Sequence, residues 1–141
     1  MVADAQGNSA VLEWVNGTDQ TDNDGSKREL RITRNEKPYQ TVTNFILVPG
    51  YYEEGDEPGG LDRYEYLTEK LDGCAGIVSD EQEAMDLLAG VGRRTWLVDG
   101  DVTKGTTVHS VVYNLTDRTS YWVANEHYGS EEHTRYYELN K

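Results

Sequence analysis

The chain has 141 residues, of which 26 are acidic and 13 are basic, so its formal net charge at pH 7 is −13. This length fits one domain of ordinary size. The excess of acids argues against a nucleic-acid or anionic-membrane surface, because both need clustered lysine and arginine. No apolar run approaches the ~20 residues that span a bilayer, no signal-peptide pattern is visible, and one cysteine excludes an internal disulfide. We expect a cytoplasmic protein without nucleic-acid or membrane partners.

The first third of the chain has the pattern of β-structure. Within residues 2–15, apolar and other side chains alternate on either side of Gln6-Gly7-Asn8, which predicts a hairpin. Residues 17–28 are almost free of apolar side chains and predict an exposed loop. Leu30 and Ile32 then resume the alternation, and residues 41–48 are apolar and β-branched enough for a strand buried on both faces.

Two helices are predicted after an exposed loop at 50–60. The first covers about 61–72, where apolar residues recur at helical spacing, and Gly73 is placed to cap it in the left-handed conformation. The second covers about 80–90. Ser79 and Gln82 have the spacing of a capping box at its start.

The last third of the chain returns to β-structure. A turn at 116–119 predicts a hairpin, and the expected strands cover 96–98, 106–115, 121–124 and 133–139. The element order predicts an α+β fold. We expect residues 2–48 and 106–139 to share one antiparallel sheet with the helical pair on one face, and residues 1–141 to be a single domain or a fragment.

The order of several short motifs resembles a known enzyme family. Val42-Thr43-Asn44-Phe45 follows a segment at 3–17 and precedes segments at 60–67 and 107–115. In this order they resemble the C-terminal part of linear-amide C–N hydrolases of the choloylglycine hydrolase type, which include bile salt hydrolases, penicillin V acylases and an acyltransferase branch. The resemblance implies the later part of a four-layer αββα sandwich of the N-terminal-nucleophile class.

The resemblance implies two catalytic residues in this chain. Family members carry an asparagine in a Thr-Asn dipeptide beside the nucleophile, and Asn44 matches it. Without the resemblance, an asparagine there is more simply explained as a turn residue. An arginine early in the next helix stabilises the family's thiolate, and Arg63 matches that position. The alternative is a surface arginine paired with Asp62 or Glu65.

The family's nucleophile is an N-terminal cysteine, whereas this chain begins Met1-Val2-Ala3 and its one cysteine is Cys74. We therefore expect the nucleophile to lie outside these 141 residues and the chain alone to be inactive. Cys74 is expected to be a structural thiol. Our hypothesis is a fragment of a hydrolase that acts on a small-molecule amide. The alternative is a stand-alone, non-catalytic binding or assembly module with the same fold.

No metal or organic cofactor is expected. Asp22-Asn23-Asp24-Gly25 resembles part of a calcium loop but lacks its closing glutamate, and His127 and His133 lack the helical spacing of zinc ligands. His109 and Ser110 are neighbours in a predicted strand, so their side chains point to opposite faces and cannot form a nucleophile–base pair.

A homo-oligomer is expected, because half of a sandwich would expose a sheet face that the missing layer covers. The apolar side chains expected on such faces are Val108, Val111, Tyr113, Tyr121 and Val123.

Overall fold

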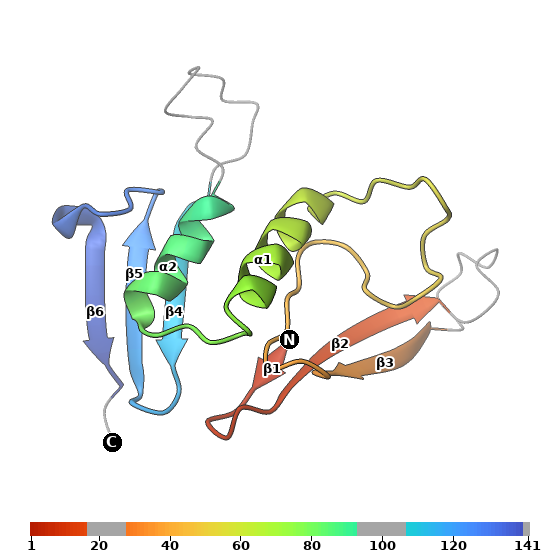
Figure 1. Ribbon diagram of the computed structural model, residues 1–141, viewed down its shortest axis with the longest axis horizontal. Coiled ribbons are helices and arrows are strands. Elements are labelled where there is room, and N and C mark those ends of the chain that lie inside the picture. Colours follow the sequence, from red (N-terminus) through yellow and green to blue (C-terminus); the bar gives the residue numbers. More distant parts are fainter. Residues whose placement is uncertain (17–27, 93–106, 140–141) are drawn as a thin grey trace, which may run out of the picture. The chain divides into compact units, whose positions relative to one another are not determined.

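The computed structural model describes residues 1–16, 28–92 and 107–139. In these residues the fold is α+β, as predicted, with two α-helices and two antiparallel three-stranded sheets (Figure 1). The residues gather into two compact units, Met1–Thr68 and Glu69–Lys141, and each holds one sheet. Among the described residues, neither helix has the length and apolar character that crossing a membrane requires.

The first sheet has the strand order β1-β2-β3, formed by β1 (Val2–Ala3), β2 (Ser9–Asn16) and β3 (Arg28–Arg34). The turn between β1 and β2 is built on Asp4. One of its carboxylate oxygens accepts hydrogen bonds from the backbone N–H groups of Gln6 and Asn8, both at 2.9 Å. The predicted hairpin is confirmed, and most of the predicted loop at 17–28 lies outside the described residues.

The two faces of the first sheet differ in exposure. Val11, Glu13 and Val15 of β2 point to a buried face. The opposite face carries four apolar side chains that are 39–65% exposed and pair across the strands: Leu12 with Ile32, and Trp14 with Leu30.

Residues 41–48 do not form the strand that the sequence predicted, so this prediction is wrong. Two of the segment's backbone N–H groups bind side chains instead of a neighbouring strand. Leu47 donates to Glu13 Oε1 at 2.7 Å, and Ile46 donates to the Tyr52 hydroxyl at 3.1 Å. Because Glu13 points to the buried face of β2, the segment covers that face rather than extending the sheet at its edge.

The first helix, α1 (Leu61–Gly73), has the predicted extent, but its cap differs. The left-handed residues are Ala75 and Gly76, with φ of 53° and 72°. The Gly76 N–H donates to the Leu71 carbonyl at 2.7 Å, and the Ala75 N–H donates to the Asp72 carbonyl at 3.1 Å. This is the pattern of a Schellman motif. It leaves Gly73 as the last helical residue, so the prediction that Gly73 is the left-handed cap is wrong.

The second sheet has the order β4-β5-β6, and α2 (Glu81–Gly90) lies across one of its faces (Figure 1). The strands are β4 (His109–Asn114), β5 (Thr119–Ala124) and β6 (Thr134–Glu138), and a short 3₁₀ helix, η1 (Glu131–His133), precedes β6. These confirm three of the predicted strands and the turn at 116–119. The fourth, at 96–98, lies outside the described residues.

The most deeply buried side chains of α2 and of the second sheet are Met85 and Val123, which are 1% and 0% exposed. Val123 is therefore not on an open face, contrary to expectation, whereas Val108 and Tyr113 are exposed as expected. The N-cap of α2 is Asp80, which accepts from the Glu83 N–H at 2.8 Å. The predicted pairing of Ser79 with Gln82 is thus wrong by one residue.

The single sheet expected from residues 2–48 and 106–139 is also wrong, because in the described residues no strand ladder joins the two sheets. The predicted strand at 41–48 is a loop. Beside it, Gln40 Nε2 donates to the Thr33 carbonyl of β3 at 3.1 Å. Three arginines on β3 (Arg28, Arg31 and Arg34) further discourage another strand from pairing there.

Candidate functional site

The two residues chosen from the sequence lie together in the Met1–Thr68 unit. Arg63 Nη2 donates a hydrogen bond to Asn44 Oδ1, although the two residues are 19 positions apart. Asn44 lies in a bend of the 41–48 loop rather than at the end of a strand. It is exposed, while Arg63, in the first turn of α1, is half-buried.

Arg63 is placed where a cation does not stabilise its helix. The N-terminal end of a helix carries partial positive charge, which favours acids over bases in the first turn. Among the described residues, no carboxylate forms a salt bridge with Arg63, so the alternative pairing with Asp62 or Glu65 is not observed. Arg63 Nε is buried without a hydrogen-bond partner. These features suit a role of Arg63 in binding a ligand better than a role in stabilising the helix.

The hydrogen bond with Arg63 fixes the orientation of the Asn44 amide. A guanidinium can only donate, so it must face the amide oxygen. The amide nitrogen is then left with its two protons, and no described residue accepts a hydrogen bond from it. Asn44 therefore presents a donor at an exposed position, next to a fixed positive charge. This combination suits an oxygen that carries or develops negative charge.

Gly60, directly before α1, makes this contact possible. It is buried, has φ of 95°, and its carbonyl accepts from the Thr43 hydroxyl and from the Tyr64 N–H, both at 3.0 Å. A Cβ atom on Gly60 would lie 2.2 Å from Asn44 Oδ1. From the sequence, Gly60 was predicted to end the 50–60 loop and to begin the 60–67 segment, and no role in a site was predicted for it. The sequence feature that could have indicated a close approach here is the glycine pair Gly59-Gly60 directly before a helix.

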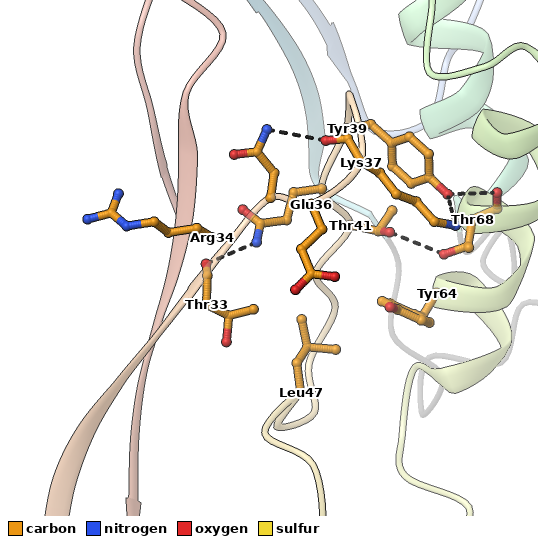
Figure 2. A pocket seen from close by; sticks show the side chains of 11 residues that line it. Thr33, Arg34, Glu36, Lys37, Tyr39, Thr41, Leu47, Tyr64 and Thr68 are labelled. Carbon is orange, nitrogen blue, oxygen red and sulfur yellow. Dashed lines mark hydrogen bonds between the residues drawn. The ribbon is translucent and has the colours of Figure 1, made fainter.

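A pocket of about 320 Å³ lies beside this site in the same unit (Figure 2). Figure 2 shows Lys37, Tyr39 and Thr41 reaching toward Thr68 of α1, and the Thr41 and Thr68 hydroxyls are 3.1 Å apart. Gln40, also in the lining, has a buried amide oxygen without a partner. The pocket was not predicted, and neither Asn44 nor Arg63 lines it.

The other residues weighed from the sequence do not form a site. The half-buried thiol of Cys74 lies 3.5 Å from the Leu71 carbonyl within its own helix cap. The rings of His127 and His133 stack at 3.9 Å between centroids instead of converging on a common point. In the described part of the chain, no three histidine, cysteine or acidic side chains gather as metal ligands. Residues 22–25, weighed as a calcium loop, lie outside the described residues.

Comparison of the chain with protein-family models, with curated proteins and with solved structures gives no match. The functional interpretation therefore depends on the geometry around Asn44 and Arg63 and on the motif resemblance.

Proposed function

We propose that this chain forms the later part of a cysteine N-terminal-nucleophile hydrolase that cleaves non-peptide linear amides, such as conjugated bile salts or penicillin V. The observation that carries the proposal is the hydrogen bond between Arg63 and Asn44. The resemblance selected these two residues from separate motifs, and a contact between them is what a shared site requires.

In the proposed reaction, a cysteine thiolate attacks the amide carbonyl, and a tetrahedral intermediate forms. The intermediate collapses to a thioester, and the amine leaves with a proton; water then hydrolyses the thioester to the acid and regenerates the thiol. The cysteine's own α-amino group serves as the base, since its pKa of about 7.7–8.0 suits neutral pH. Asn44 donates to the oxygen that becomes negative, and Arg63 favours the thiolate.

The test uses the protein expressed from its complete open reading frame and measures the amine released from conjugated bile salts and penicillin V. We expect turnover, and we expect Asn44→Ala and Arg63→Ala each to lower kcat/KM by about 10²–10³-fold. Arg135→Ala, which removes an exposed arginine of β6, is the matched control and should leave kcat/KM unchanged. Absence of amine release, or full activity in both site variants, would refute the proposal.

The 141-residue chain by itself is expected to release no amine above background, because this mechanism needs a cysteine with a free α-amino group. Cys74 lies within the chain and has no such group. Assay of the purified chain beside its Cys74→Ala variant checks this. Turnover that disappears in Cys74→Ala would identify Cys74 as the nucleophile and contradict the mechanism.

A second candidate function is a non-catalytic binding module, and the pocket near Thr68 supports it. Its lining contains the Lys37 ammonium, which donates to the Tyr39 hydroxyl, the hydrogen-bonded hydroxyls of Thr41 and Thr68, and an unpartnered acceptor in Gln40. Such a mixture suits a small polar molecule with several hydroxyl or amide groups. In a titration followed by NMR, an amide substrate that shifts the signals of Thr41 and Gln40 but not those of Asn44 would favour this function over hydrolysis.

A further inference from the structure

We infer that Gly60 is the positioning residue of the Asn44–Arg63 pair. Its missing side chain leaves the space in which the two side chains meet, and its carbonyl oxygen holds their two segments together. The inference deepens the proposed function and rests on it, because the pair is a catalytic site only under that function.

The space above Gly60 is filled by the two side chains of the pair. A Cβ atom there would lie 2.2 Å from Asn44 Oδ1 and 2.9 Å from Arg63 Nη2. Both distances are shorter than a Cβ contact permits, so any other residue at position 60 would displace the ends of these side chains from their present positions. The neighbouring Gly59 differs, since a Cβ atom there would lie 3.4 Å from the nearest atom, Asn44 Nδ2, at an ordinary contact distance.

The carbonyl oxygen of Gly60 joins the loop to the helix. It accepts from the hydroxyl of Thr43, the residue before Asn44, and from the backbone N–H of Tyr64, the residue after Arg63, each at 3.0 Å. One atom therefore fixes the backbone next to both members of the pair. The 41–48 loop has no strand ladder. Ile46 and Leu47 anchor its later part, and the hydrogen bond of the Thr43 hydroxyl is the anchor next to Asn44.

The first test separates the space at Gly60 from its backbone conformation. Gly55 has the same φ of 95° but open space around its Cβ position, so Gly55→Ala is a matched control for strain alone. We expect Gly60→Ala to lower the midpoint of thermal unfolding of the 141-residue chain by about 4 °C more than Gly55→Ala does. The additional decrease caused by Gly60→Ala should be smaller when Asn44 is also replaced by alanine. Equal losses in the two glycine variants would overturn the inference.

The second test removes only the hydroxyl that binds the Gly60 carbonyl. Thr43→Val keeps the shape of the side chain and Thr43→Ser keeps the hydroxyl. In NMR spectra of the chain, we expect the side-chain N–H signals of Asn44 and Arg63 to move in Thr43→Val and to return to their wild-type positions in Thr43→Ser. In the protein from the complete reading frame, Thr43→Val should lower kcat/KM by about tenfold or more, since small displacements of reacting groups are costly, and Thr43→Ser should restore it.

The two readouts separate the inference from the proposed function. If the complete protein releases no amine while the side-chain signals respond as expected, the proposed function fails and the positioning by Gly60 holds. If the complete protein is active and Thr43→Val changes neither the signals nor kcat/KM, the positioning inference is wrong.

Discussion

Glu81 shows how one side chain joins a helix to a sheet. Its Oε1 atom accepts from Asn114 Nδ2 of β4 at 2.9 Å and from the Thr119 hydroxyl of β5 at 3.2 Å. The hydrogen bond from the Asn114 side chain is the main cause that lowers the pKa of Glu81 from its ordinary value of 4.5, and the backbone N–H of Glu81 itself and the Thr119 hydroxyl contribute further. All of these bonds stabilise the ionised carboxylate.

We predict that Glu81 contributes to the loss of stability in acid. Because its pKa is lower in the folded chain, its contribution to the free energy of unfolding is fully present above pH 4.5 and is lost as the pH falls below that value. Glu81→Gln should therefore show a smaller decrease in the free energy of unfolding between neutral and acidic pH, measured by urea denaturation. Glu69→Gln, which removes an exposed carboxylate on α1, is the control and should follow the wild-type curve. A Glu81→Gln profile parallel to that of the wild type would contradict the prediction.

Among individual residues, the sequence singled out Asn44 and Arg63, which the structure brings into contact, but it did not predict how they meet. Asn44 and Arg63 were proposed because each stands in a motif that resembles the family. Thr43 and Gly60 stand in the same motifs, but their hydrogen bond was not predicted, because it depends on a close approach between residues 17 positions apart, which no local pattern encodes. The pocket at Gln40 and Thr68 was missed for the same reason.

For the secondary-structure elements, periodicity predicted where the two helices and the β-hairpins lie. It did not predict the capping residues at the helix ends. Ser79 and Asp80 are both good N-cap residues, and each has a Gln or Glu three positions later, so the sequence permits two registers. The structure selects Asp80, and the carboxylate of Glu83 then accepts from the Ser79 N–H at 2.7 Å. Residues 41–48 failed as a strand because their hydrogen-bond partners are side chains, and strand propensity alone does not reveal such partners.

Two glycines at the end of α1 are predicted to respond to alanine substitution with changes of opposite sign in the free energy of unfolding. Gly73 is helical, and a Cβ atom there would meet nothing within 4 Å, whereas Gly76 has φ of 72°. Gly73→Ala should raise the free energy of unfolding by about 0.5–1 kcal/mol, because alanine has less conformational entropy to lose. Gly76→Ala should lower it by about 1–2 kcal/mol, because a side chain is strained in the left-handed conformation. Urea denaturation measures both, and a loss of stability in Gly73→Ala would contradict the assigned helix end.

Across the chain, strand pairings between neighbouring segments were predicted and distant ones were not. Each confirmed hairpin joins strands that are close in sequence. The single sheet required pairing between a strand within residues 2–48 and a strand within residues 106–139, and alternation within a strand does not say which other strand lies beside it. The result is two three-stranded sheets, one in each unit.

The exposed apolar face of the first sheet is the strongest reason to expect self-association. Leu12, Trp14, Leu30 and Ile32 form a contiguous apolar face that is 39–65% exposed. Arg28 and Arg34 lie at the two ends of this face, opposite Asn16 and Ala10. Aromatic residues and arginine are enriched in protein–protein interfaces, and burial of apolar surface contributes roughly 25 cal/mol per Å². The net charge of −13 opposes growth beyond a small oligomer.

We therefore predict that the chain forms a homodimer through this face. Light scattering at micromolar concentration should give about twice the chain mass of 15.9 kDa. Trp14→Lys should shift the population to monomer, because an ammonium group is costly to bury in an apolar interface. Tyr113→Lys, which changes an aromatic residue of the second sheet that is 59% exposed, against 65% for Trp14, is the control and should leave the dimer intact. A wild-type chain that remains a 15.9 kDa monomer would show that the exposed face does not drive association on its own.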